Sequence, residues 1–336
     1  MYNLKSYPEQ IVPRLKYGFK DIEIQLHKPL DKKDISTTLD AIHRGARINV
    51  VHAAFTKEAD ASIKQSIIHP EIFSMVEDAC RLAKLCASEQ SQPVSALIHN
   101  GFADSDCIVF SDAVKKATGV IADTARNYPG VPLLIENAAP IMYRDGRTII
   151  REKCSATAQK FVIDEIQNHM VEASAVIDTC HAKMVKTYYE RSTGETWDTF
   201  WKEMFSEYYE NDIEVGLFHI ADCAGSGLGK DHGISFSENS RSELAHILAL
   251  RERYFPESEI TIEVTEEDYT KEPKNYIKTK NMIDEWKTGR LSFKDKCCLC
   301  KRDLYGSGLS VHYIDGAGYL CGKCYKQVYS AKNPEY

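Results

Sequence analysis

Short runs of apolar and β-branched residues recur along most of the chain, separated by segments long enough to form helices. The runs that we expect to form strands are residues 2–4, 21–26, 48–52, 94–99, 131–136, 174–178, 215–219 and 260–263. An intervening stretch at 70–88 places Ile72, Val76 and Ala79 at helical spacing. Strands that alternate with helices form a parallel sheet, and eight such units favour its closed form. The pattern therefore predicts an α/β protein with a (β/α)₈ TIM barrel.

The predicted strands are apolar almost throughout, as expected for strands that are buried on both faces. An open doubly wound sheet is the alternative, but no glycine-rich phosphate-binding fingerprint follows the first strands. A segment rich in aromatic residues at 184–211 is interpreted as a helix that buries an aromatic stripe. A platform for substrate is the alternative for this segment.

The length of 336 residues accommodates a barrel of roughly 250 residues and a small appendage. We assign residues 1–270 to the barrel, 271–295 to a basic linker or helix, and 296–336 to a separate module. The net charge of −7 argues weakly against a uniformly basic surface for nucleic acids, although it leaves a local cationic groove open. No apolar run approaches the roughly 18 residues of a membrane span, and the first residues do not resemble a secretory signal. We therefore expect a cytoplasmic protein.

Most of the predicted strands end in a residue that can bind a metal ion. These residues are His52, His99, Glu136, Asp178, His219 and Glu263. His181 follows Asp178 by three residues. One such histidine would be more typical of a hydrogen-bonded core residue, but in a barrel all the C-terminal strand ends meet at one face, where active sites lie. The sequence therefore predicts a cluster of ligands at that mouth.

The residue types in this cluster indicate metal ions. Several carboxylates buried together without cations would cost several kcal/mol each. Imidazoles mixed with carboxylates, without thiolates, suit zinc or another borderline ion such as manganese. Clustered ions of this kind could produce a hydroxide nucleophile and bind the oxygens of a phosphoryl group.

The ordered series of motifs resembles the endonuclease IV family of apurinic/apyrimidinic endonucleases, in the xylose-isomerase-like TIM-barrel superfamily. The resemblance extends over residues 1–270, and its most specific segment is the Ile-Asp-Thr-Cys-His run at 177–181. The remaining motifs are Val-His-Ala-Ala-Phe at 51–55, Ile-His-Asn-Gly at 98–101, Leu-Ile-Glu-Asn at 134–137, Phe-His-Ile-Ala-Asp at 218–222, Lys-Asp-His-Gly at 230–233 and Ile-Glu at 262–263.

This resemblance implies a trinuclear zinc site. The implied ligand sets are His52, His99 and Glu136; Glu136, Asp178, His219 and Glu263; and His181 with His232, and the first two sets share Glu136. On this resemblance we expect two or three ions in the barrel, mainly Zn²⁺ and in part Mn²⁺. In the family the third ion also takes an Asp that is separated from the His by one residue, whereas Asp231 and His232 are adjacent here. Either the loop has lost one residue and Asp231 still ligates, or only His232 is equivalent.

The resemblance also implies the reaction: cleavage of DNA 5′ to an abasic site by a hydroxide generated at the metal ions, with the damaged nucleotide flipped out. Glu136 and Glu263 are the expected catalytic carboxylates. Phe55 lies where the family has an aromatic residue that enters the DNA stack, and packing of the barrel rim is its alternative role. The expected partner is duplex DNA with an abasic or damaged site, which would associate the protein with the nucleoid.

Two other functions fit the same barrel. Sugar isomerases and epimerases of the superfamily use one divalent ion held by two Glu, an Asp and a His, a set that Glu136, Asp178, His219 and Glu263 could supply. That interpretation leaves His52, His99, His181 and His232 unexplained. A barrel that retains only a binding role for nucleic acid or protein would be expected to lack ligands, and only the Asp231 position hints at such a loss.

Near the C-terminus two cysteine pairs indicate a structural zinc site. Cys297 and Cys300 form one pair, and Cys321 and Cys324 form the other. Four thiolates at this spacing close a tetrahedral site and stabilise a segment too small for its own core. We expect a zinc-ribbon-like Cys₄ module, which endonuclease IV does not ordinarily carry. The many lysines around it are consistent with contacts to the phosphate backbone, or with a solvated linker and a protein-docking module.

Overall fold

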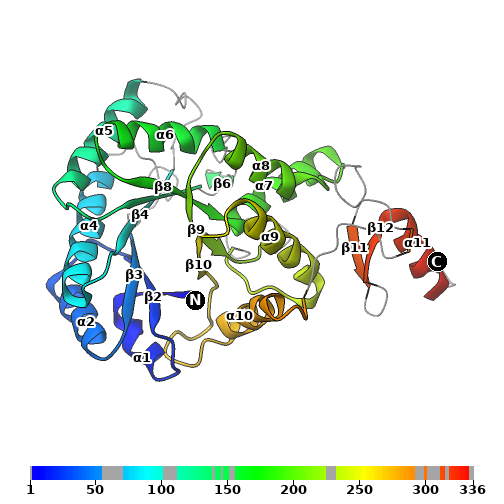
Figure 1. Cartoon of the computed structure of the whole chain (residues 1–336), viewed down its shortest axis with the longest axis horizontal. Helices are drawn as coiled ribbons and strands as arrows, with labels where there is room; N and C mark the ends of the chain where they lie inside the picture. The colour runs from blue at the N-terminus through cyan, green and yellow to red at the C-terminus, as the bar shows by residue number, and fades with distance from the viewer. Residues whose placement is uncertain are drawn as a thin grey trace.

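The computed structural model describes residues 2–54, 71–100, 112–137, 141–144, 147–150, 156–224, 232–291, 299–300, 311–314 and 318–332. Within these residues, eight strands close a parallel barrel (Figure 1). In order around the barrel they are β1 (Asn3–Ser6), β10 (Glu259–Ile262), β9 (Val215–Ile220), β8 (Ala173–Asp178), β5 (Leu133–Glu136), β4 (Ser95–His99), β3 (Arg47–His52) and β2 (Asp21–Gln25). The predicted (β/α)₈ fold is confirmed.

Helices surround the barrel and pack their apolar faces on its strands. They are α1 (Ile11–Leu15), α2 (Lys32–His43), α4 (Glu71–Gln90), α5 (Asp112–Arg126), α6 (Ala156–Asn168), α7 (Thr179–Thr193), α8 (Phe200–Glu210), α9 (Arg241–Tyr254) and α10 (Lys274–Lys287), with short 3₁₀ turns η1 (Pro8–Gln10) and η4 (Glu238–Ser240). In α4, for example, Ile72, Val76 and Ala79 are buried along one face, as their spacing predicts. Among the described helices, none combines the length and apolar character that crossing a membrane requires.

The barrel interior is filled by side chains from alternate strand positions. Five of them form a cluster that we call the apolar layer: Val50, Leu97, Leu134, Val176 and Leu217. Because side chains alternate along a strand, the residue two positions later points into the barrel as well. Those next residues are His52, His99, Glu136, Asp178 and His219. The predicted ligands therefore lie directly above a packed apolar floor.

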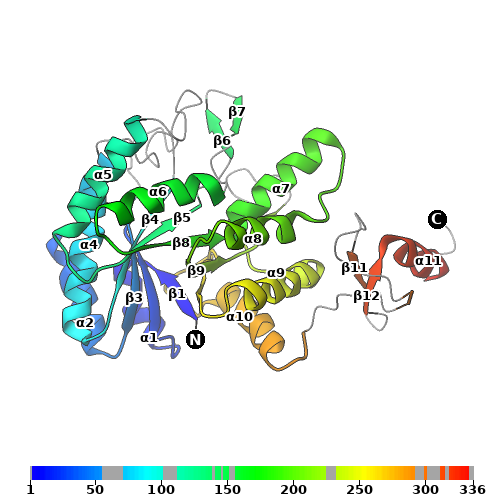
Figure 2. The ribbon, with the colours of Figure 1, turned by 45° about the horizontal axis from the view of Figure 1, so that its top comes forward.

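The region between β8 and β9 differs from its prediction. Residues 184–211 do not form one helix, because Gly194 ends α7 with a left-handed φ of 74° and α8 begins at Phe200. The aromatic stripe is nevertheless buried, since Trp201, Phe205 and Tyr208 are all at most 3% exposed. A hairpin of β6 (Ile141–Arg144) and β7 (Arg147–Ile150), which the sequence did not predict, lies between β5 and α6. Figure 2 shows this hairpin and α7 rising on the same side of the barrel.

The C-terminal part of the chain contains two different structures. Within the segment assigned to a basic linker, α10 packs against α9 and β10 and buries Tyr276, Met282 and Ile283, so this segment contributes a helix to the barrel wall. Beyond it, β11 (Val311–Ile314) pairs in antiparallel fashion with β12 (Gly318–Cys321), and α11 (Gly322–Lys332) follows. Figures 1 and 2 both draw this small unit beside the barrel.

Candidate metal centre

The C-terminal ends of six strands bring the predicted ligands together at one mouth of the barrel. Three overlapping groups have ligand atoms that all lie within 4.8 Å of one another: His52, His99 and Glu136; Glu136, Asp178, His219 and Glu263; and Asp178, His181 and His232. Below they are called the first, second and third groups in that order. Glu136 belongs to the first and second groups, and Asp178 to the second and third.

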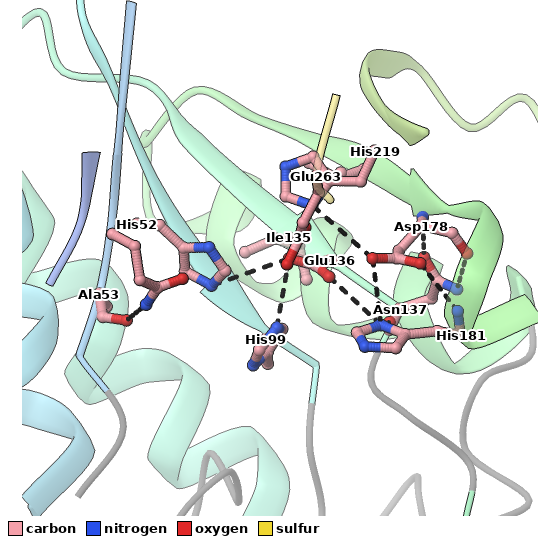
Figure 3. Close-up of polar contacts among 12 residues, drawn as sticks. His52, Ala53, His99, Ile135, Glu136, Asn137, Asp178, His181, His219 and Glu263 are labelled. Carbon is pink, nitrogen blue, oxygen red and sulfur yellow. Dashed lines mark hydrogen bonds and ion pairs between the residues drawn. The ribbon is translucent and has the colours of Figure 1, made fainter. Parts of the chain in front are cut away.

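Glu136 lies at the centre of the site, fully buried at the end of β5 (Figure 3). Its Oε2 is 3.2 Å from His99 Nε2, 3.8 Å from His52 Nε2 and 3.4 Å from His219 Nδ1. Its Oε1 is 3.2 Å from His181 Nδ1. One carboxylate thus faces four imidazoles that come from four different elements.

The surroundings of Glu136 keep it ionised. Burial alone would raise its pKa, but the charges of His99 and His219 and the contact with His181 outweigh burial and lower the pKa well below its usual value. Within the described part of the chain, neither oxygen of this carboxylate accepts a hydrogen bond. A buried anion without hydrogen bonds is costly, and a metal ion is the usual way to compensate it.

In the second group, hydrogen bonds occupy one oxygen of Asp178 and one oxygen of Glu263. Asp178 caps the N-terminus of α7, where its Oδ1 accepts a 2.8 Å hydrogen bond from the His181 amide. Its Oδ2 accepts no hydrogen bond from any residue that the structure describes. Burial and repulsion by Glu263 and Glu136 outweigh the attraction of His181 and raise the pKa of Asp178 to about 7.

Asn137 fixes Asp178 against the neighbouring strand. Its side-chain oxygen accepts a 2.6 Å hydrogen bond from the Asp178 amide, and its side-chain nitrogen donates to the Asp178 carbonyl at 3.1 Å. The Asn137 carbonyl is 2.7 Å from His181 Nδ1. The segment that follows β5 therefore positions one ligand of the second group and one of the third.

In the third group, His181 and His232 face each other, with their Nε2 atoms 2.9 Å apart. Gly233 follows His232 with a φ of +69°, and a Cβ there would lie 3.2 Å from Thr265 Oγ1 and 3.3 Å from the Glu263 carbonyl. A glycine therefore lets His232 approach the end of β10. Burial, together with the nearby charge of His181, lowers the pKa of His232 to about 4. Both histidines are then arranged to share one cation.

Some predicted site residues lie outside the described residues. Phe55 and Asp231 are among them, so neither alternative for Asp231 is tested, and the carboxylate that accompanies the two histidines in the third group is Asp178. In the tail, Cys300, Cys321 and Cys324 form a group that could hold a metal, with the sulfurs of Cys300 and Cys321 3.7 Å apart. Cys297, the fourth predicted ligand, also lies outside the described residues.

Two charged residues at the centre were missed by the sequence analysis. Glu23 on β2 is fully buried, and the Lys5 side chain on β1 is 14% exposed. Lys5 was missed because the first strand was expected to end at residue 4, whereas β1 extends to Ser6. A signal for Glu23 existed: it alternates with Ile22 and Ile24 in a strand that should be apolar on both faces.

The residues present fit divalent metal ions. Imidazole and carboxylate atoms converge on each group, and several of those atoms, such as both oxygens of Glu136 and Oε2 of Glu263, accept no hydrogen bond from the described residues. This donor set without thiolates suits zinc or manganese. The barrel thus holds the ligands of one or more divalent metal sites.

No family model matches the chain, and no curated protein matches it either. Among solved structures, a D-tagatose 3-epimerase-like protein is 16% identical with a TM-score of 0.55, over 85% of this chain and 97% of that protein. A protein from Thermus thermophilus soaked with ZnCl₂ is 16% identical with a TM-score of 0.48, over 84% and 98%. A D-psicose 3-epimerase, solved in the presence of D-fructose, is 12% identical with a TM-score of 0.47, over 84% and 97%. At such low identity, the likeness to the first of these shows that the chain shares its fold.

Proposed function

We propose that this protein is a metal-dependent phosphodiester hydrolase of the endonuclease IV type that cleaves DNA at abasic sites. The observation that carries the proposal is the overlap of three ligand groups through Glu136 and Asp178. A single ion uses three or four protein ligands. The eight residues of the three groups exceed that need, and shared carboxylates are what a multinuclear centre requires.

Ions held in these groups would supply Lewis acidity and a water nucleophile that is active at neutral pH. The chain's own part is to hold the ions close together and to keep the site anionic. Glu136 would do so for the first two groups, because its Oε2 lies within 3.8 Å of His52, His99 and His219. Glu263 lies at the edge of the site, with 14% of its side chain exposed, and would help to hold an ion of the second group on the side that a substrate can approach. We assign the catalytic roles to these two carboxylates.

The DNA substrate is supported by the motif series and by the chemistry of the centre. Several ions in one site can stabilise both the attacking and the leaving oxygen of a phosphoryl transfer. An abasic nucleotide is easily turned out of the helix, because it has no base to unstack or unpair. Phe55 and the lysine-rich tail belong to this proposal as DNA contacts, and the Cys₄ site belongs to it as a structural zinc site.

A second candidate is a sugar isomerase or epimerase that uses one divalent ion. The second group alone has the two Glu, one Asp and one His that such enzymes use. The likeness to a D-tagatose 3-epimerase-like protein favours this candidate more than the first. It gives no role to His52, His99, His181 and His232, which converge on the same mouth.

The two candidates differ in substrate and in metal content. The purified protein, loaded with Zn²⁺ or Mn²⁺, is incubated with a labelled duplex that carries one abasic-site analogue, and separately with D-tagatose and D-fructose. We expect metal-dependent nicking 5′ to the analogue, at least ~100-fold slower for Glu263→Gln because a metal ligand is lost. Glu259→Gln is the matched control, because Glu259 is an exposed glutamate at the start of β10, the strand that ends just before Glu263, and this variant should nick normally.

Metal analysis gives a second, independent criterion. A variant with Cys321→Ser and Cys324→Ser separates zinc in the tail from ions in the barrel. Two or three ions in the barrel are expected. One ion in the barrel, no nicking, and interconversion of a ketose would together replace the hydrolase with the epimerase.

A further inference from the structure

One sector of the barrel interior is polar where the rest is apolar. Below the ligands, five strands contribute the apolar layer, but β2 places Glu23 in register with Val50 of that layer. The neighbouring strands β1 and β10 contribute Lys5 and Thr261, and Lys5 is in register with Glu23. A buried charged pair in place of a packed apolar side chain seldom improves stability. We therefore expect these polar residues to have a functional role rather than a stabilising one.

Glu23 contacts two histidines that belong to different metal groups. Its Oε2 lies 3.0 Å from His219 Nε2 and accepts a 2.8 Å hydrogen bond from Thr261 Oγ1. Its Oε1 lies 3.4 Å from His52 Nδ1. His219 is a member of the second group and His52 a member of the first. One carboxylate thus supports both groups from below.

These contacts determine which ring nitrogens face the metal groups. An ionised carboxylate can only accept hydrogen bonds, so His219 donates to Glu23 from Nε2, and the longer ion-pair contact of His52 favours a proton on its Nδ1. When each ring carries a single proton, its other nitrogen has a lone pair for a metal. For His219 that atom is Nδ1, which faces Glu136 and Glu263, and for His52 it is Nε2, which faces Glu136.

Lys5 acts on the other side of Glu23. Its Nζ donates a 2.5 Å hydrogen bond to Glu263 Oε1 and lies 3.9 Å from Glu23 Oε1. The ammonium group therefore balances the charge of Glu23 and occupies one oxygen of Glu263. The remaining oxygen, Oε2, is directed toward His219 Nδ1 at 2.5 Å, on the side of the second group.

We propose that Glu23 is a positioning residue that aligns the ligands of the first and second metal groups together, with Lys5 as its charge partner and as the clamp on Glu263. Both groups depend on Glu23, whereas the ligand that Lys5 contacts directly, Glu263, belongs to the second group. The inference rests on the metal binding of the proposed function, but not on the identity of the substrate.

The test compares Glu23→Gln with wild type. Glutamine keeps the size of the side chain but turns one oxygen into a donor, which cannot accept from a protonated imidazole nitrogen. We expect Zn²⁺ affinity, measured by competition with a chromophoric chelator, to fall about 10–100-fold at both the first and the second group, as for other residues that orient ligands. Lys5→Met should weaken the second group and leave the first within about threefold. Glu259→Gln is the matched control and should bind as wild type does.

A second measurement reads the protonated nitrogens directly. In the Zn²⁺-loaded protein, ¹⁵N NMR of the imidazoles should find His219 protonated at Nε2 and His52 at Nδ1, and Glu23→Gln should change this assignment. If Glu23→Gln does not fold, Glu23→Asp, which keeps the charge but shortens the reach, replaces it and should also weaken both groups. Affinities within threefold of wild type together with unchanged tautomers would overturn the inference. A wild-type barrel that takes up no ion would overturn the proposed function as well, so the two failures are distinguishable.

Discussion

The apolar layer and the ligands above it differ in what they contribute, although they lie two residues apart on the same five strands. The apolar layer is closed, since its members are at most 6% exposed and contact one another. The ligands are buried as well, yet several of their polar atoms accept no hydrogen bond from the described residues. The side chains of the apolar layer are fully packed, whereas some polar atoms of the ligand layer have no hydrogen bond from the described residues. The barrel thus separates a layer that stabilises the fold from a layer whose side chains can bind metal ions.

The largest effect should follow from Glu136→Gln. This change removes the carboxylate that the first two groups share, so metal-dependent turnover should fall on the order of 10³-fold or more, which corresponds to several kcal/mol of transition-state stabilisation. The unfolding free energy of the metal-free protein, measured by urea denaturation in chelator, should change by no more than about 2 kcal/mol. A large loss of stability with activity retained would contradict the separation of the two layers.

Leu97→Ala tests the apolar layer in the opposite way. The Leu97 side chain is fully buried, and its truncation should lower the unfolding free energy by about 2–4 kcal/mol through lost burial and a residual cavity. The number of bound ions should stay the same, as metal analysis would establish. Leu85→Ala is the matched control, because Leu85 on α4 is 37% exposed and its truncation should have little effect on stability.

Removal of metal should destabilise the protein by an intermediate amount. Ions that bind the folded state at a hundredfold excess over their dissociation constant contribute about 3 kcal/mol. A chelator should therefore lower the melting temperature of wild type and have a much smaller effect on Glu136→Gln. Equal shifts in the two proteins, measured by calorimetry, would place the stabilising ion elsewhere, for example at the tail cysteines.

The smallest effect concerns acid and a histidine outside both layers. Burial lowers the pKa of His246 on α9 to about 4. Because the unfolded chain binds a proton near pH 6.5, the contribution of neutral His246 is complete above that pH and is lost as the pH falls toward 4. We expect about 1 kcal/mol of lost stability between pH 6.5 and 5. His246→Gln should flatten this slope in denaturation curves, and an unchanged slope would assign the acid sensitivity to other groups.

The fold and most of the ligands were accessible from the sequence for one reason. In a parallel barrel the C-terminal ends of all strands lie at the same mouth. An apolar run that ends in His52 or Glu136 therefore predicts a strand and also places its last side chain at that mouth. Glu23 and Lys5 lie inside their strands, where no such rule applies and where only the broken apolar pattern marked them. The β6–β7 hairpin and the break at Gly194 depend on local backbone geometry, which periodicity does not encode.

The two oxygens of the Asp178 carboxylate have different partners, and this has a consequence for NMR spectroscopy. One oxygen caps α7 through the His181 amide, and the other belongs to the metal groups. An ion that draws charge toward Oδ2 weakens the acceptor at Oδ1, so the proton on the His181 amide should shift upfield and exchange faster when the site fills. That single backbone resonance would report metal occupancy in solution without any label on the metal.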